Sequence, residues 1–410
     1  MEQDNGKHIL AFAYACAPDE GGEPGAGWVW TRMLGQWADV TIFTRENNRD
    51  AIVAALPTTP EADRLHFEYV DLPRQMRFWK RGPRGARLYY VFWQIAALRR
   101  ARRLADASPP DIVWHLTWAN AWLGSLAALL GYPFVYGPVG GGVGTPWRLA
   151  PALGWRGFSS ELARTSARTV ARYLNPLARV SWQRAQVILV QNPETREWLP
   201  RRHREKVVLF SNVVLDEHPD AQRSRTRSAR PTMLYVGRLL PWKGVSLAIR
   251  TLVPLAGWEL TICGGGPDLK RLRKLARRLG VADRVRFLGR LPRTDARRLM
   301  RESADALIFP SLHDEGGFVV AEALAAGLPV VCLDRGGPPV LGGAPVAVFS
   351  MSSTISALGR AVLDTIESTP PRYPSMGQHS ERVGRLLRHM QMKQEVRVKR
   401  STTEGRWGTA

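Results

Sequence analysis

The chain has 410 residues, 45% of them hydrophobic, and carries a formal net charge of +22. This length is enough for two α/β domains with ordinary globular cores. The most apolar region, 112–139, is interrupted by His115, Asn120, Gly131 and Pro133, which excludes a membrane-spanning helix there. The positive charge favours an anionic partner, which is nucleic acid, an acidic membrane surface or a phosphorylated substrate.

The three cysteines, Cys16, Cys263 and Cys332, lie in or next to predicted strands. Their number is odd and their spacing is not that of metal ligands, so we expect buried thiols in a reducing compartment. The first residues, MEQDNGKH, are polar and acidic, which predicts no signal peptide. The sequence therefore predicts a cytoplasmic protein.

The first predicted strand, 7–15, leads into a glycine-containing loop, 16–27, and then into a helix over 28–36. A glycine-rich loop between strand and helix permits the close approach of a phosphate, although many such loops are only tight turns. The pattern is not G-x-G-x-x-G, and no acidic residue ends the next strand, 40–43, in the ribose-binding position. A dinucleotide site is therefore weakly supported.

Residues 74–103 hold ten basic residues and no acidic one. Aromatic residues alternate with them: Phe78, Trp79, Tyr89, Tyr90, Phe92 and Trp93. Residues 87–104 have the pattern of an amphipathic helix. This segment is either a core helix with solvated arginines, a patch that meets anionic lipid headgroups, or a nucleic-acid site. No nucleic-acid-binding module is visible, so we expect no specific nucleic-acid partner.

A buried strand over 111–116 carries His115 at its carboxyl end. A lone histidine in apolar company is usually a hydrogen-bonded core residue. Open α/β sheets, however, place ligands beyond the carboxyl ends of their strands, so we expect His115 to face a cleft. Strands at 133–136, 187–191 and 207–210 complete the sheet, and glycines 140–142 are predicted to line its acceptor side.

A polar, aperiodic segment, 216–231, is predicted to link a second α/β domain. This domain opens with a strand, 232–236, after which Arg238 and Lys243 lie five residues apart. Arginine supplies a planar fork and lysine a point charge, so both suit one anion.

The strongest pattern is the stretch 309–334, FPSLHDEGGFVVAEALAAGLPVVCLD, which predicts a βαβ unit. Glycines 316 and 317 leave amides open at the helix N-terminus, which suits a phosphate or a polar sugar. Seven residues separate Asp314 from Glu322, so both carboxylates can face one ligand. Asp314 alone is equally well explained as a helix cap, whereas Glu322 lies among apolar residues, where a carboxylate is costly unless paired.

The last part of the chain, from 367, is basic and irregular. A helix at 356–366 precedes it, and a second helix is predicted at 380–391. The last fifteen or so residues have the composition of a disordered segment.

The segment PSLHDEGGFVVAEALAAGLPVV resembles the donor-site motif of retaining glycosyltransferases of family 4, which have the GT-B fold. In that motif two glutamates flank seven residues; here Asp314 takes the first acidic position. The resemblance implies that Glu322 binds the ribose hydroxyls of a nucleotide sugar and that Asp314, with the amides after it, binds the sugar. It also implies that His115 contacts the donor sugar. It extends over roughly residues 5–365.

The same resemblance supplies the other donor contacts. Arg238 and Lys243 resemble the family's diphosphate clamp, and the Gly21–Gly22 loop would lie against the same diphosphate. The catalytic residues that it implies are His115, Asp314 and Glu322. The nucleotide- and sugar-binding residues that it implies are Gly264, Gly265, Arg290, Leu291, Glu315, Gly316, Gly317, Phe318 and Glu322.

We therefore predict an α/β protein of the GT-B type, with two Rossmann-like, doubly wound domains across a cleft. The predicted units are an acceptor-side domain (1–215), a linker (216–231), a donor-binding domain (232–366) and a basic tail with a return helix (367–410).

The predicted activity is retaining transfer of a hexose from a nucleotide diphosphate sugar to a lipid-linked or cell-envelope glycan, with no metal or other cofactor. The predicted location is the inner face of the plasma membrane, where the basic face meets anionic lipid. The alternatives are a nucleotide-sugar epimerase of the same fold and a non-catalytic basic scaffold that binds membranes or nucleic acid.

Overall fold

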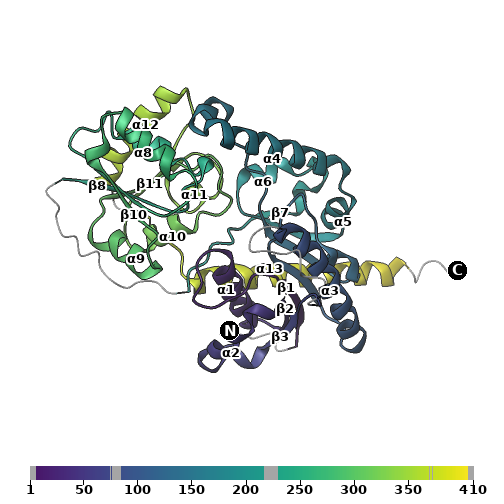
Figure 1. Cartoon of the computed structure of the whole chain (residues 1–410). Helices are drawn as coiled ribbons and strands as arrows, with labels where there is room; N and C mark the ends of the chain where they lie inside the picture. Colours follow the sequence, from purple (N-terminus) through teal and green to yellow (C-terminus); the bar gives the residue numbers. More distant parts are fainter. Residues whose placement is uncertain are drawn as a thin grey trace.

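The computed structural model describes residues 6–73, 75, 85–216, 230–368, 370–371 and 373–404, with the backbone alone over 393–404. Two α/β domains, each built on a parallel sheet, follow one another along the chain (Figure 1). The predicted pair of doubly wound, Rossmann-like domains is confirmed. Most of the predicted linker lies outside the described residues.

The N-terminal sheet has seven strands in the order β3-β2-β1-β4-β5-β6-β7. They are β1 (His8–Ala13), β2 (Asp39–Arg45), β3 (Leu65–Val70), β4 (Ile112–Thr117), β5 (Phe134–Val139), β6 (Ala185–Val190) and β7 (Val207–Leu209). Leu10 and Phe12 point into one core cluster, and Ile9 and Ala11 point into the other, as the two-residue period of a strand requires. The strand order reverses between β1 and β4, which opens a crevice beyond their carboxyl ends.

The C-terminal sheet has six strands in the order β10-β9-β8-β11-β12-β13. They are β8 (Thr232–Val236), β9 (Glu259–Cys263), β10 (Val285–Gly289), β11 (Ala306–Phe309), β12 (Val330–Leu333) and β13 (Ala344–Val346). In the centre of the sheet, Leu307 pairs with Leu234 on one side and with Val330 on the other. Here the order reverses between β8 and β11, so each domain has one switch point for a ligand.

Helices connect the parallel strands, as parallel pairing requires. In the first domain they are α1 (Glu23–Gly35), α2 (Arg49–Ala55), α3 (Ala86–Ala107), α4 (Gly154–Leu174), α5 (Pro176–Arg184) and α6 (Pro193–Trp198). In the second they are α7 (Val245–Thr251), α8 (Leu269–Arg278), α9 (Arg293–Glu302), α10 (Phe318–Ala325), α11 (Gly337–Val340) and α12 (Met351–Ile366). None of the described helices has the length and apolar composition needed to cross a bilayer.

Helix α1 begins at Glu23, five residues before the predicted start at Trp28. Gly25 and Gly27, predicted to belong to an open loop, lie inside the helix instead. A Cβ atom on Gly27 would overlap the carbonyl oxygen of Ala15, which follows β1. Gly27 therefore lets the helix approach the sheet closely, and the predicted long glycine loop is wrong.

Helix α3 settles the interpretation of the described part of the basic segment. Tyr89, Tyr90 and Trp93 are at most 1% exposed and belong to the core of the first domain. The arginines of α3 lie on its outer side, where Arg100 pairs with Glu68. The described part is thus a core helix with solvated arginines, and its buried aromatic rings do not form the expected interfacial patch. Residues 74 and 76–84, including Phe78 and Trp79, lie outside the described residues.

The last helix, α13 (Met376–Glu404), returns to the first domain and runs along α1 (Figure 1). Val383 and Leu387 are buried in the core cluster that contains β1. Nε1 of Trp37 donates a hydrogen bond to Oγ of Ser380 at 3.0 Å. The helix spans the predicted segment 380–391 and continues to Glu404, so the described part of the end that was predicted to be disordered is helical.

Candidate functional site

A cavity of about 430 Å³ lies where the switch points of the two domains face each other. Its C-terminal wall follows β8 and β11, and its N-terminal wall follows β4 and β5. The lining residues are Glu23, Arg87, Trp118, Ala119, Asn120, Leu123, Gly140, Gly141, Gln191, Asn212, Arg238, Trp242, Lys243, His313, Asp314, Glu315, Gly316 and Phe318. The structure therefore brings together Arg238, Lys243 and Asp314, which the sequence predicted as donor contacts.

Lys243 and Asp314 form an ion pair inside this cavity. Their loops touch because Gly244, at φ 71°, lies against the carbonyl oxygen of Pro310, where any side chain would overlap it. The two side chains are only 18% and 14% exposed. Asp314 thus fixes the position of the Lys243 ammonium group. The place of Asp314 in the loop sequence did not predict this role.

Glu315 belongs to the seam between the domains. Its carboxylate accepts hydrogen bonds from Nδ2 of Asn192 at 3.0 Å and from Oγ1 of Thr195 at 3.3 Å, both in the first domain. The amides that follow, at Gly316 and Gly317, precede α10, and Gly317 adopts φ 88°. The loop that was predicted to bind the donor sugar is therefore held from both domains.

Glu322 lies on α10 and is paired by two arginines of α9. Nε of Arg293 is 2.6 Å from Oε1 of Glu322, and Nη2 of Arg297 is 3.8 Å from the same oxygen. The carboxylate is therefore compensated, as its apolar surroundings require. Neither arginine was predicted from the sequence. Their i, i+4 spacing at the start of α9, next to the predicted Arg290 turn, was the available signal.

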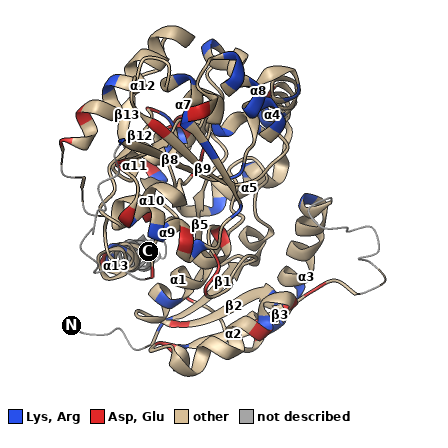
Figure 2. Ribbon diagram, turned by 60° about the vertical axis from the view of Figure 1, so that its left-hand side comes forward, with Lys and Arg blue, Asp and Glu red and all other residues tan. Residues whose placement is uncertain are grey.

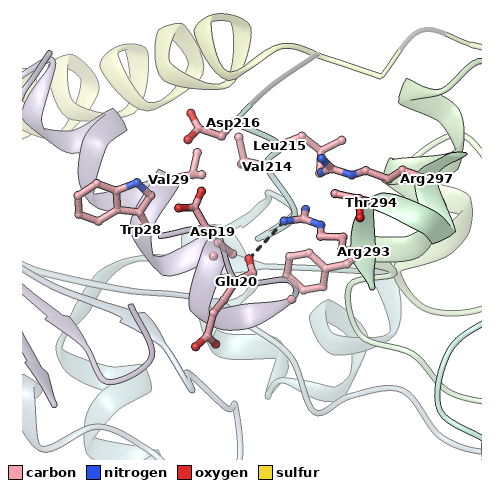
Figure 3. A pocket seen from close by; sticks show the side chains of 14 residues that line it. Asp19, Glu20, Trp28, Val29, Val214, Leu215, Asp216, Arg293, Thr294 and Arg297 are labelled. Carbon is pink, nitrogen blue, oxygen red and sulfur yellow. Dashed lines mark hydrogen bonds between the residues drawn. The ribbon is translucent and has the colours of Figure 1, made fainter. Parts of the chain in front are cut away.

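Arg293 also reaches the first domain. Its Nη1 donates a hydrogen bond of 3.4 Å to the carbonyl oxygen of Glu20, drawn as a dashed line in Figure 3. A second cavity, of about 280 Å³, lies here and is lined by Arg293, Arg297 and Gly22 among others. Phe318 lines both cavities, so they adjoin at the start of α10.

The Gly21–Gly22 loop faces this second cavity. Gly22 has φ 74° and directly precedes the first turn of α1. A Cβ atom on Gly21 would lie 3.9 Å from the Arg293 side chain. In this structure the loop is therefore next to Arg293, and its contact with a donor diphosphate stays a prediction.

Gly264, Gly265, Arg290 and Leu291 line neither of these two cavities. Gly264, at φ 153°, lies against the carbonyl oxygen of Gly237, where a side chain would overlap. A Cβ atom on Gly265 would lie 3.3 Å from the Arg290 side chain, so these two turns do adjoin. Their part in binding the nucleotide stays a prediction.

His115 does not face the cleft, and that prediction is wrong. Its ring is fully buried, and Nε2 lies 2.7 Å from the hydroxyl oxygen of Tyr90. Nδ1 contacts the hydroxyl of Ser125. Burial lowers the pKa of His115 to about 4, so the ring is neutral at physiological pH. The position of His115 near the carboxyl end of a strand was predicted correctly, but its side chain points into the core.

A second histidine, His313, does reach the cavity and was missed. Its ring stacks on Trp242, with centroids 5.6 Å apart, and its Nδ1 lies 3.3 Å from Oε2 of Glu161 on α4. Burial lowers the pKa of His313, which favours a neutral ring that donates to the Glu161 carboxylate. The donor loop is therefore anchored to α4 of the first domain.

Asn212 lines this cavity and carries one unsatisfied polar atom, which is buried beside Gly316. The residue is 9% exposed, and its Oδ1 accepts no hydrogen bond within the described part of the chain. Buried polar atoms without partners are rare in folded proteins. Among the described residues, no group of three or more His, Cys, Asp or Glu is gathered as metal ligands would be. Metal independence stays a prediction.

Comparisons with known proteins cover both domains. A family model described as "Glycosyl transferase 4-like domain" matches residues 20–212, and one described as "Glycosyl transferases group 1" matches residues 216–380.

Among curated relatives, the D-inositol 3-phosphate glycosyltransferase of Mycobacterium marinum is 36% identical over 132 residues, which are 30% of this chain and 28% of the relative. The GDP-mannose-dependent alpha-(1-6)-phosphatidylinositol monomannoside mannosyltransferase of Mycobacterium tuberculosis is 40% identical over 121 residues, 27% of this chain and 31% of the relative. The chain thus matches less than a third of the length of these two relatives.

Solved structures resemble the whole chain. The lipopolysaccharide outer core galactosyltransferase WaaB aligns with a TM-score of 0.59 at 14% identity, covering 93% of this chain and 99% of that one. HepE of Anabaena, in complex with UDP and glucose, aligns with a TM-score of 0.57 at 16% identity, covering 93% and 100%. These likenesses show the fold. Since the two family models account for both domains, the chain belongs to glycosyltransferase family 4 and has the GT-B fold.

Proposed function

We propose that this protein transfers a hexose from a nucleotide diphosphate sugar to a lipid-linked or cell-envelope glycan, with retention of the anomeric configuration. The observation that carries this proposal is the cavity between the two switch points, where Arg238 and Lys243 meet the donor loop. The relatives support it, since their names include a GDP-mannose donor and phosphatidylinositol or inositol phosphate acceptors.

The chemical task is to stabilise a departing diphosphate while the sugar gains positive charge. Arg238 and Lys243 supply fixed positive charge, and the amides before α10 supply hydrogen-bond donors. Asp314 holds Lys243 in place before the donor arrives, so little reorganisation is needed. No side chain is assigned as a nucleophile. In this proposal the leaving phosphate accepts the proton of the acceptor hydroxyl.

Thermal shifts with nucleoside diphosphates test the donor half of the proposal. UDP, GDP and ADP are added separately to the full chain, and one of them is expected to raise the melting temperature, because ligands that bind only the folded state stabilise it. The matching nucleotide sugars are then assayed for release of the nucleoside diphosphate. A folded protein that responds to none of these nucleotides and releases none would refute the proposal.

Helix α4 supports the membrane-surface part of the proposal. Five of its exposed residues are large and apolar: Trp155 is 80% exposed, Leu162 50%, Val170 56%, Tyr173 58% and Leu174 73%. Most of these residues are separated by about whole helical turns, so they share one face of the helix. The inward residues are polar instead, since Arg164 and Arg168 donate hydrogen bonds to the carbonyl oxygens of Val143 and Gly142. An ordinary surface helix has apolar side chains on its inner face and charged ones on its outer face, so α4 reverses the usual pattern.

Basic residues border this apolar face. Lys and Arg are dense on α8, LKRLRKLARR, which lies beside α4 in Figure 2, and α4 adds Arg156 and Arg172. The two helices adjoin, since a Cβ atom on Gly154 would lie 3.6 Å from the Arg271 side chain. An apolar stripe with a cationic border suits the surface of an anionic membrane. We therefore place the peripheral membrane contact on α4 and α8, not on α3.

Vesicle flotation tests this contact. The wild-type chain is expected to float with vesicles that contain phosphatidylglycerol and less well with neutral vesicles. The Trp155→Ser/Leu174→Ser double variant is expected to lose flotation. A matched control, Val53→Ser/Val253→Ser, removes residues that are 54% and 53% exposed on other surfaces and should float like the wild type. Equal flotation of all three proteins would refute the contact.

A further inference from the structure

The N-terminal wall of the 430 Å³ cavity has its own chemistry. The proposed donor contacts, Arg238, Lys243 and Asp314, all lie on the opposite wall. Glu23, Arg87 and Trp118 line the N-terminal wall. They come from three different elements, which are the start of α1, the start of α3 and the loop after β4. None of them was singled out by the sequence motif.

Trp118 is held in a strained backbone conformation at this wall. Its φ is 56°, a left-handed value that is rare for a bulky residue and that clusters at functional sites. The indole ring is fixed by Tyr14 and Tyr90, with ring centroids 4.7 Å and 5.3 Å away. A rigid aromatic surface at the edge of a polar cavity matches the C–H face of a sugar-like ring.

Glu23 faces the cavity beside Trp118. Its Oε1 accepts a hydrogen bond from the Trp118 amide at 2.5 Å, and within the described residues no other hydrogen bond to this carboxylate occurs. The second carboxylate oxygen therefore remains for a ligand hydroxyl. Asn212 lines the same cavity, but its Oδ1 is buried beside Gly316 and is not part of this surface. A ligand hydroxyl group meets the need of Glu23.

Arg87 supplies positive charge at the rim. Its guanidinium carbon lies 5.6 Å from the centre of the Trp122 ring, and within the described residues it has no carboxylate partner. An exposed guanidinium without an acidic partner is well suited to bind a phosphate with two parallel hydrogen bonds. On the N-terminal wall, the Glu23 carboxylate would repel a phosphate placed next to it, so an anionic group on this wall belongs beside Arg87.

We propose that Glu23, Arg87 and Trp118 form the acceptor subsite, and that it takes a hydroxylated ring carrying a phosphate group. The ring stacks on Trp118, one of its hydroxyls meets Glu23, and its phosphate meets Arg87. This inference rests on the proposed glycosyl transfer and names the class of its acceptor. The phosphate belongs either to a free sugar phosphate or to the phosphodiester of a lipid-linked sugar, since both present the same group.

Ligand-observed NMR tests the subsite without any turnover. The probes are glucose, glucose 6-phosphate and a polyprenyl phosphoglucose in detergent micelles, each added to the full chain. At least one phosphorylated probe is expected to bind about tenfold more tightly than glucose, because a charge-assisted bidentate contact is added. Tighter binding of the free phosphate or of the lipid phosphodiester identifies the source. Equal binding of all three probes would overturn the proposal.

Variants locate the binding. Arg87→Gln is expected to remove the advantage of the phosphorylated probe, whereas Arg99→Gln, an exposed arginine farther along α3, leaves it unchanged. Arg238→Gln should weaken nucleoside diphosphate binding and spare the phosphorylated probe. If Arg238→Gln and not Arg87→Gln removes the advantage, the probe occupies the donor wall and the subsite is refuted. If wild-type protein binds the probe but no nucleoside diphosphate, the donor proposal fails and the subsite stands.

Glu23→Gln separates binding from folding. Glutamine keeps an oxygen that accepts the Trp118 amide hydrogen, so the melting temperature is expected to stay near that of the wild type. Binding of the ring is expected to weaken several-fold, because a neutral amide accepts a hydroxyl hydrogen less strongly than a carboxylate. An unchanged affinity for all probes would remove Glu23 from the subsite.

Discussion

Arg293 and Glu322 form a direct ion pair between α9 and α10, with Nε of Arg293 2.6 Å from Oε1 of Glu322. The same guanidinium reaches the carbonyl oxygen of Glu20 in the first domain. Glu322, the residue with the clearest predicted donor contact, is therefore already engaged by a residue that also touches the other domain. A ribose that binds Glu322 has to share this carboxylate with Arg293.

The pair is expected to show coupling in a double-mutant cycle. Arg293→Ala and Glu322→Gln should each lower the melting temperature. The double variant should melt no lower than the less stable of the two single variants. The coupling is expected to be about 1 kcal/mol or less, because the Arg293 side chain is 36% exposed and water screens the pair. Additive effects in thermal melts would show that the pair contributes no stability.

Loss of Lys243 is expected to weaken donor binding. Lys243→Ala should lower the affinity for the stabilising nucleoside diphosphate by about 1–3 kcal/mol, since it removes a charged hydrogen-bond donor. Glu322→Ala should act similarly on a nucleotide with a ribose. Titration calorimetry measures both, with Lys270→Ala, an exposed lysine on α8, as the control. Wild-type affinity in Lys243→Ala would contradict the assignment of the diphosphate site.

His115 is expected to make stability depend on pH. Its pKa is about 4 in the folded protein and near 6.5 in the unfolded chain, so the unfolded state binds the proton more readily. Its contribution is fully present above pH 6.5 and is lost as pH falls towards 4, at up to about 1.4 kcal/mol per pH unit.

His115→Gln tests this dependence, because glutamine does not titrate. Melting temperatures between pH 7 and pH 4 are expected to fall less steeply in this variant than in the wild type. His8, His203 and His313 also have pKa values lowered mainly by burial, so part of the slope should remain. Identical slopes would mean that His115 is not the buried neutral residue that the structure shows.

The contact between α13 and the first domain gives a matched pair of glycine variants. A Cβ atom on Gly384 would overlap the Trp37 ring, whereas one on Gly377 has its nearest atom, Oγ of Ser375, at 3.7 Å. Gly384→Ala is expected to destabilise the protein by about 1–2 kcal/mol through overpacking, which exceeds the gain in helix propensity. Gly377→Ala should be neutral or slightly stabilising. Equal melting temperatures would indicate that α13 does not pack on Trp37.

The sequence by itself determined the local units. Alternating apolar strands, helix boundaries such as Gly327 and the 309–334 pattern depend on neighbours along the chain, so the two doubly wound domains and the cluster of Arg238, Lys243 and Asp314 were predictable. Strand ends in parallel sheets meet at one edge, which is why residues far apart in sequence were placed together correctly.

The tertiary structure decided which partner each polar side chain has. In the folded chain His115 points into the core, and Gly25 and Gly27 lie inside α1. Glu322 is paired with Arg293. The tertiary structure also gathered Glu23, Arg87 and Trp118 on one wall, although they come from three separate segments. Side-chain direction and long-range pairing depend on how elements pack across the sheet and between domains, and one sequence shows neither.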